Sequence, residues 1–181
     1  GIDLVLVEID ADLAGLARAN AEANALAAEV IVLDVEAAAD TFAAANLHPD
    51  SVDVVLMNPP FNDSARHRVS PDRARGIAHV ATATTLSTWI HAARRILKSR
   101  GMLTLIWRAD GLSDVLAALA RGFGAVAIKP VHPRAGSAAI RILVEATKGA
   151  RGPLRLLDRL TLDAPQAESV LRDATPLMLQ D

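Results

Sequence analysis

The sequence of 181 residues contains no cysteine and no tyrosine, and aromatic side chains make up only 3% of it. Without cysteine, the chain can form no disulfide, no cysteine-ligated zinc site and no thiol nucleophile. No apolar run approaches the roughly 18 residues that a membrane helix needs, and residues 1–4 lack the basic segment that opens a signal peptide. The length of one ordinary domain, with 51% hydrophobic residues, therefore predicts a soluble, cytoplasmic globular protein.

Patterns typical of metal sites and of activated nucleophiles are also missing. The five histidines show no ligand spacing to one another or to acidic residues, so we expect no metal ion. The serines lie in no nucleophile-elbow pattern, and the chain has no phosphate-binding P-loop sequence.

The formal net charge of −2 conceals a strong segregation of charge along the chain. Residues 1–65 carry twelve acids and one base, whereas residues 66–159 carry seventeen bases and five acids. Such a basic region favours a polyanion, above all a nucleic acid, as partner. A set of solvated basic faces is the alternative.

Short apolar runs alternate with amphipathic segments along the chain. Strands are expected at residues 4–9, 30–34, 51–57, 102–107, 125–131 and 138–147, and helices at 10–26, 37–47, 77–98, 112–119 and 165–173. This alternation predicts an α/β fold with a doubly wound, mostly parallel Rossmann-like sheet, whose closing hairpin adds an antiparallel edge strand. Residues 59–76 form a long polar loop in this reading. We expect residues 1–152 to form the main domain, with residues 153–181 as an appended strand and short helix packed on it.

Polar side chains follow three of the expected strands at their carboxyl ends, where ligands bind in such sheets. Glu8 can accept two hydrogen bonds from a ribose diol, although a capping or solvated acid has the same sequence pattern. Asp34, together with the backbone N–H of Val35, can read the edge of an adenine, with a helix cap as the alternative.

The sharpest signal is Asn58-Pro59-Pro60-Phe61, which directly follows an apolar strand. An amino group on a planar base is a poor nucleophile because its lone pair is delocalised. The Asn58 side-chain oxygen and the Pro59 carbonyl oxygen can accept both of its N–H bonds, which places the nitrogen for attack on a methyl group. Phe61 offers a face on which a base can stack. A rigid loop start with a core-filling phenylalanine is the alternative.

These residues resemble those of a known enzyme class. Residues 7–10, 33–35 and 57–61 resemble the part of a class I S-adenosylmethionine-dependent methyltransferase that follows its glycine-rich motif. The Asn-Pro-Pro-Phe sequence is shared by enzymes that methylate adenine N6, guanine N2 and protein glutamine N5. Three later segments are similar to the bacterial tRNA1(Val) (adenine-N6)-methyltransferase family: Val131–Arg134, Arg141–Val144 and Lys148–Leu154.

The resemblance implies a role for each residue of the strand ends. Glu8 would hold the ribose of S-adenosylmethionine, and Asp34 with the Val35 backbone would hold its adenine. Asn58 would contact the cofactor, and Asn58 and Pro59 would bind the target amino group. The other residues of this motif would complete the catalytic site, with Phe61 stacked on the base; they are Pro59, Pro60 and Phe61.

The resemblance also implies an RNA partner, whose phosphate groups would be bound by basic side chains. These are Arg66, Arg68, Arg73, Arg75, His132, Arg134, Lys148 and Arg151. Arg94 and Arg95 are set aside, because arginine on a helix face is usually solvated.

The chain departs from the class in one respect. No glycine-rich turn follows any expected strand, and the chain opens at what would be the second strand. The first strand of this fold lies at the centre of the sheet, between the strands that end at Glu8 and Asn58. We therefore expect an N-terminally truncated methyltransferase domain that lacks its central strand.

The expected activity is methyl transfer from S-adenosylmethionine to an exocyclic amine, with adenine N6 of tRNA favoured. Guanine N2 of ribosomal RNA and glutamine N5 of a protein stay open as targets. A non-catalytic RNA-binding module descended from a methyltransferase is the alternative of a different kind.

Overall fold

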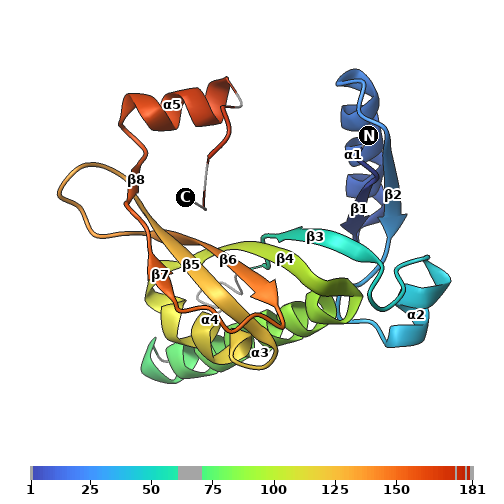
Figure 1. The fold of residues 1–181 in the computed structure, drawn as a ribbon, viewed down its shortest axis with the longest axis horizontal. Coiled ribbons are helices and arrows are strands. Elements are labelled where there is room, and N and C mark those ends of the chain that lie inside the picture. The colour runs from blue at the N-terminus through green and yellow to red at the C-terminus, as the bar shows by residue number, and fades with distance from the viewer. Residues whose placement is uncertain (1, 61–70, 174, 178, 180–181) are drawn as a thin grey trace. The chain divides into compact units, whose positions relative to one another are not determined.

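The structure is a computed structural model that describes residues 2–60, 71–173, 175–177 and 179, with the side chains of its longest helix described from Thr84 onward. The chain divides into two compact units, Gly1–Pro49 (unit 1) and Asp50–Asp181 (unit 2). Each unit has its own strands, shown in Figure 1.

Unit 1 is a strand–helix–strand motif followed by a short helix. Its elements are β1 (Leu4–Glu8), α1 (Ala11–Ala23), β2 (Ala28–Val32) and α2 (Ala39–Ala44). The two strands pair in parallel, with Glu8 opposite Val32. Helix α1 begins after Asp10, whose carboxylate accepts hydrogen bonds from two backbone N–H groups of the first turn. Because the strands are parallel, both end at the same edge of the motif.

Unit 2 contains the larger sheet. Its elements are β3 (Val52–Met57), α3 (Pro71–Ile96), β4 (Leu97–Arg108), η2 (Ala109–Gly111), α4 (Leu112–Leu119), β5 (Phe123–His132), β6 (Arg141–Lys148), β7 (Arg155–Leu156), β8 (Leu160–Thr161) and α5 (Pro165–Arg172). The strand order is β3-β4-β6-β5-β7, with β8 also beside β5.

The strand directions of unit 2 define two edges of its sheet. Strand β3 is parallel to β4, and β6 is antiparallel to both β4 and β5. Strands β3, β4 and β5 therefore end together, at what we call the carboxyl edge. The start of β4 and the end of β6 lie at the opposite edge, which we call the amino edge.

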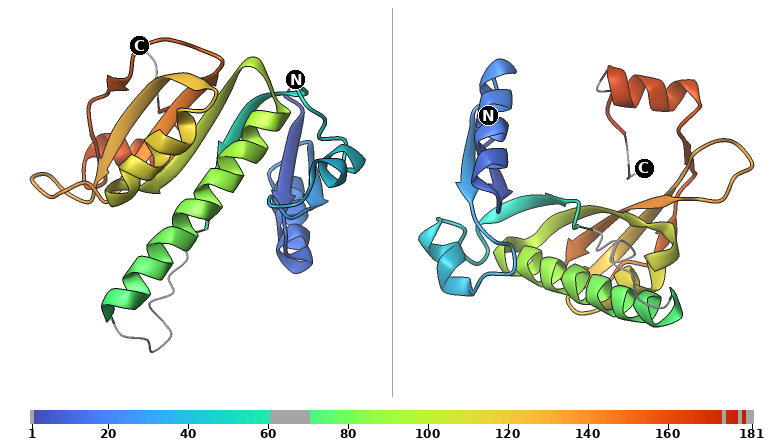
Figure 2. Two further views of the ribbon diagram at one scale, coloured as in Figure 1. Left: turned by 90° about the horizontal axis from the view of Figure 1, so that it is seen from below. Right: turned by 180° about the vertical axis from the view of Figure 1, so that it is seen from behind.

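Helices α3 and α4 cover one face of this sheet (Figures 1 and 2). The α3 side chains that face the sheet recur at helical spacing and are buried; they are Leu86, Ile90 and Ala93. They pack on alternate residues of β4, namely Leu103, Leu105 and Trp107, none of which is more than 1% exposed. The opposite face of β5 and β6 packs against β8 and α5 through Val131, Leu160 and Ala167.

The predicted α/β sheet of mostly parallel strands is confirmed, with two differences in detail. The antiparallel strand expected at the edge is β6, and it lies between β4 and β5. It suits that place because Ile142, Val144 and Ala146 are all buried, as a strand with neighbours on both sides requires. Helix α3 begins at Pro71, so Arg73 and Arg75 lie in a helix and not in the expected loop. Proline is well tolerated in a first helical turn.

The strands of the two units form separate sheets. In the described ranges, β1 pairs only with β2, and β3 pairs only with β4 on one side. Each of these two strands also leaves apolar side chains exposed: Val5 and Val7 on β1, and Val54 and Leu56 on β3, with Leu56 exposed to 76%. None of the described helices is both long enough and apolar enough to cross a membrane.

Shortening one side chain at the centre of the α3–β4 packing should strongly destabilise unit 2. We expect Leu105→Ala to lower the free energy of unfolding in urea by about 2–5 kcal/mol, because it leaves a cavity among buried side chains. Leu156→Ala is the matched control, since Leu156 is 71% exposed on β7, and should change stability by about 0.5 kcal/mol or less. Equal stability of the two variants would contradict the central position of Leu105.

Candidate active site

In unit 1, the Glu8 carboxylate is held at the carboxyl end of β1 by the turn that follows it. Its Oε1 atom accepts hydrogen bonds from the backbone N–H groups of Ile9, at 2.8 Å, and Asp10, at 3.0 Å. The backbone N–H of Leu33 also donates to the Glu8 carbonyl oxygen, at 2.9 Å, which ties the ends of β1 and β2 together. Within the described residues Oε2 of Glu8 accepts no hydrogen bond, so one oxygen is fixed and the other is available.

The second predicted acid of unit 1, Asp34, has the same arrangement. Its Oδ1 atom accepts a hydrogen bond from the backbone N–H of Glu36 at 2.8 Å, and the side chain is exposed. Val35, between them, is half-buried. Glu8 and Asp34 therefore follow adjacent parallel strands at one edge, each with one carboxylate oxygen engaged by its own turn. Neither residue caps a helix: Asp10 caps α1, and α2 begins after Ala38 without a side-chain cap.

In unit 2, Asn58 and Pro59 follow β3 at the carboxyl edge. Met57 is opposite Leu105 of β4, so the next residues lie beside the last residues of β4. The Asn58 side chain is exposed, whereas Pro59 is fully buried. A buried proline anchors the backbone at this point, while the amide of Asn58 remains accessible to a ligand. Phe61, the last residue of the motif, lies outside the described residues.

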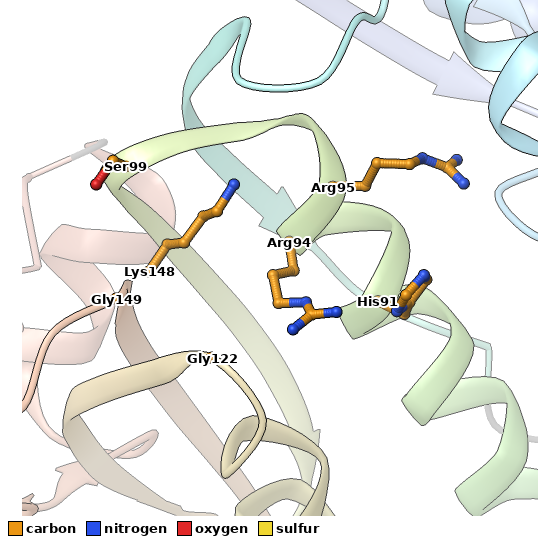
Figure 3. Close-up of a pocket in the computed structure, with 7 residues that line it drawn as sticks. All are labelled: His91, Arg94, Arg95, Ser99, Gly122, Lys148 and Gly149. Carbon is orange, nitrogen blue, oxygen red and sulfur yellow. The ribbon is translucent and has the colours of Figure 1, made fainter.

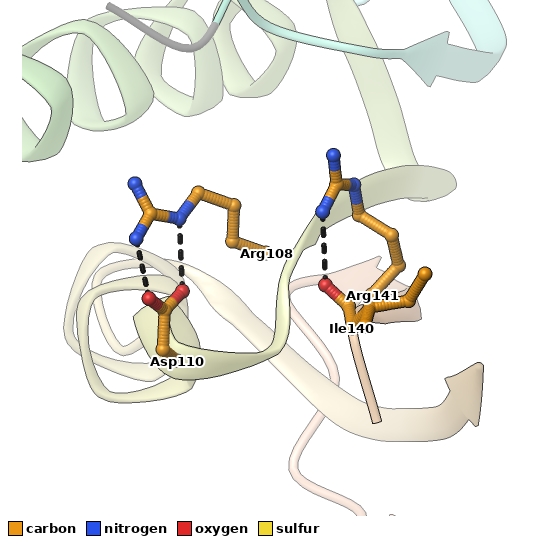
Figure 4. Close-up of polar contacts among 4 residues, drawn as sticks. All are labelled: Arg108, Asp110, Ile140 and Arg141. Carbon is orange, nitrogen blue, oxygen red and sulfur yellow. Dashed lines mark hydrogen bonds and ion pairs between the residues drawn. The ribbon is translucent and has the colours of Figure 1, made fainter. Parts of the chain in front are cut away.

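Two arginines that the sequence reading did not select lie at the same edge. Arg108 ends β4 and is directly opposite Arg141, the first residue of β6. Figure 4 shows the Arg108 guanidinium beside the Asp110 carboxylate and the Arg141 guanidinium beside the Ile140 carbonyl oxygen. Arg108 Nε donates to Asp110 at 2.9 Å, in an ion pair with a second contact through Nη2, and Arg141 donates to the Ile140 carbonyl at 3.0 Å. Their places at strand ends were the signal that could have identified them.

The predicted phosphate-binding residues are divided between the two edges. His132 ends β5 at the carboxyl edge, where its Nδ1 is 2.7 Å from the Ser137 carbonyl oxygen, and Arg134 is exposed in the hairpin that follows. Lys148 ends β6 at the amino edge and pairs with Asp50 at 2.8 Å. Exposed Arg151 follows it. These residues therefore do not form one surface.

The remaining predicted residues cannot be placed in the site. Arg66 and Arg68 lie outside the described residues, and Arg73 and Arg75 belong to the part of α3 whose side chains are not described. The described residues include no group of three or more histidine and carboxylate side chains that could hold a metal ion.

Comparison with known proteins identifies the family and the fold of the chain. Residues 1–131 match the family described as "methyltransferase small domain". The chain is 27% identical to a predicted O-methyltransferase from Agrobacterium tumefaciens, with a TM-score of 0.73 over 93% of this chain and 76% of that one. No curated protein matches the sequence.

Two further solved structures share the fold at lower identity. One is a protein from Listeria monocytogenes assigned to the class I S-adenosylmethionine-dependent methyltransferases, at 17% identity and a TM-score of 0.62, with 94% of this chain and 54% of that one covered. The other is an rRNA methylase from Streptococcus thermophilus, at 12% identity and a TM-score of 0.51, with 81% and 73% covered. The predicted methyltransferase fold is thus confirmed.

Removing the cap of α1 should loosen the turn that fixes Glu8. We expect Asp10→Ala to destabilise the start of α1 by about 1 kcal/mol, because it removes the acceptor for two backbone N–H groups. Amide hydrogen exchange in α1 measures this as faster exchange. Asp3→Ala is the control, since Asp3 is exposed before β1. The same α1 protection in both variants would show that the cap contributes nothing.

Proposed function

The chain belongs to the methyltransferase small domain family, and we propose that it transfers a methyl group from S-adenosylmethionine to an exocyclic amine, adenine N6 of tRNA before other targets. The observation that supports the choice of an amine is the pair of acceptors that follows β3. The Asn58 side chain is exposed at the carboxyl edge, directly before a buried Pro59.

The amine must be held by acceptors because its lone pair is delocalised into the base. An amino group offers two N–H donors; the exposed Asn58 side-chain oxygen would accept one, and the Pro59 carbonyl oxygen would accept the other. Accepting both bonds favours a tetrahedral nitrogen and aligns its lone pair with the methyl group. The nitrogen can lose its proton to water afterwards, so this chain needs no general base. Phe61, next in the motif, would stack on the base.

The acidic strand ends of unit 1 fit the nucleoside part of the methyl donor. When bound, S-adenosylmethionine supplies a methyl group activated by its positive sulfur. Glu8, with one oxygen fixed by the Ile9 and Asp10 N–H groups, would accept hydrogen bonds from the ribose hydroxyls. Asp34 and the Val35 backbone would hold the adenine. The Listeria relative of the same fold is assigned to the enzymes that use this donor.

Basic side chains at the carboxyl edge of unit 2 favour RNA over a protein as substrate. Arg108 and Arg141 are adjacent across β4 and β6, and exposed Arg134 follows β5 at the same edge. Arginine binds phosphate groups through several N–H donors at once. One relative of the same fold is an rRNA methylase, so guanine N2 of ribosomal RNA is the next target to test.

Replacing Glu8 should weaken the binding of S-adenosylhomocysteine, the product form of the donor. We expect Glu8→Gln to raise its Kd about 10- to 100-fold, because one charged acceptor for the ribose is lost while the turn keeps its oxygen. Isothermal titration calorimetry measures this Kd. Glu22→Gln on the exposed side of α1 is the matched control. An unchanged Kd for Glu8→Gln would contradict the ribose role.

Replacing Asn58 should lower methyl transfer far more than it weakens donor binding. We expect Asn58→Ala to lower the transfer of labelled methyl groups onto undermodified bulk tRNA by about 100-fold or more, the loss typical of a transition-state hydrogen bond. The product of the unaltered protein, digested to nucleosides, should be N6-methyladenosine. Asn20→Ala, on exposed α1, is the control.

The digest also separates the competing targets. Methylation of guanine N2 or glutamine N5 would support an amine as the methyl acceptor but identify a different substrate. A methylated hydroxyl, the product implied by the name of the Agrobacterium relative, would contradict the amine. A protein that binds no donor at all would be the non-catalytic module.

A further inference from the structure

A pocket of about 410 Å³ lies at the amino edge of unit 2. His91, Arg94 and Arg95, from the end of α3, contribute to its lining, and Lys148 contributes from the end of β6. Ser99 and the two glycines at positions 122 and 149 complete it. Figure 3 shows these groups around the junction of α3 and β4. The lining contains three permanently cationic side chains and no acidic one, which favours an anion.

The cations of the pocket are held in place by the surrounding backbone. Arg94 Nη1 donates to the Arg121 carbonyl oxygen at 3.2 Å, and its aliphatic part lies against Gly122. A Cβ atom at position 122, where φ is +105°, would be 2.8 Å from Arg94 Cδ. Glycine therefore allows the turn to approach the arginine and hold it. A guanidinium has five N–H donors, so this contact leaves others for a ligand.

Lys148 is held in a similar way, and its positive charge is only partly neutralised. Its ammonium group donates to Asp50 at 2.8 Å and to the Leu97 carbonyl oxygen. Asp50 is largely exposed, at 64%, so water screens this pair. One such carboxylate does not balance both Arg94 and Lys148. The pocket therefore keeps a positive potential.

The pocket is remote from the acceptor pair of the proposed reaction. Asn58 follows the carboxyl end of β3, whereas Ser99 and Lys148 lie at the opposite end of the same sheet. The six residues of β3 separate the two places by roughly 20 Å, at about 3.3 Å per residue. A single nucleotide bound at Asn58 cannot reach the pocket, but a polynucleotide can.

We propose that this pocket binds backbone phosphate groups of the RNA substrate, away from the base that is methylated. The inference rests on the proposed function for the identity of the substrate. It gives the amino edge a role in binding that is separate from the acceptors at the carboxyl edge. A free nucleoside or a short peptide would gain nothing from it.

Pocket variants test the proposal through RNA binding alone. The probe is undermodified bulk tRNA, measured by filter binding to the unlabelled protein over a series of salt concentrations. We expect Arg94→Gln to weaken binding about 3- to 10-fold and to lower the slope of log K against log salt by about one, because one phosphate contact is lost. Ser99→Glu, which adds a negative charge to the pocket, should weaken binding by a similar factor. Arg94→Lys, which keeps the charge, should restore most of the affinity.

Matched controls carry the same charge changes outside the pocket. Arg172→Gln removes an exposed cation of α5, and Ser113→Glu adds a charge at the exposed start of α4; both should bind tRNA as the unaltered protein does. Thermal unfolding of every variant confirms that folding is retained. Pocket variants that match the controls in affinity and slope would overturn the proposal. The proposal would also be overturned if the protein bound inorganic phosphate in a way that depends on Arg94 but bound no RNA.

The outcome is independent of the methylation test. RNA binding that depends on Arg94 and Ser99, in a protein that transfers no methyl group, would support the pocket and reject the proposed reaction. If the protein methylates tRNA but the pocket variants bind tRNA as tightly as the control variants do, the proposed reaction is supported and the role of the pocket in RNA binding is rejected.

Discussion

The packing of β4 against α3 is the interaction on which unit 2 depends. Leu103, Leu105 and Trp107 alternate along β4 and are buried against one face of α3 and against α4. The same strand pairs with β3 on one side and β6 on the other. The pairing of β4 therefore fixes the position of Asn58 at the end of β3. It also fixes where the ends of α3 and β6 come together. Asn58 lies beside the end of β4, and the basic pocket lies at its start.

The sequence predicted the parts of the molecule that depend on local periodicity. Alternating apolar runs and the helical spacing of Leu86, Ile90 and Ala93 were sufficient for an α/β sheet with a covered face. The place of β6 was not predictable in this way, because the order of strands depends on pairings between residues far apart in the chain. Local pattern also missed the start of α3, where the polar residues after Pro71 resemble a loop.

The candidate site was predictable to the extent that it consists of strand ends. Glu8, Asp34 and Asn58 were found by their position after apolar runs, and the structure places each at a carboxyl end. Arg108 and Arg141 needed the register of β4 and β6, which brings together residues more than thirty positions apart. The basic half of the sequence likewise appeared as one surface, whereas the antiparallel course of β6 carries Lys148 to the opposite edge from His132.

The position of β6 also has a consequence for how the protein is made. Strand β5 pairs with β6, and β4 pairs with β6, so β4 and β5 have no direct pairing with each other. A nascent chain that has emerged only as far as residue 132 holds both strands without the one that joins them. Their apolar faces must wait for residues 141–148, since non-local pairing follows chain growth. Unit 2 therefore completes its core only after Lys148 has emerged, which makes the interval between residues 132 and 148 the period when a chaperone is most useful.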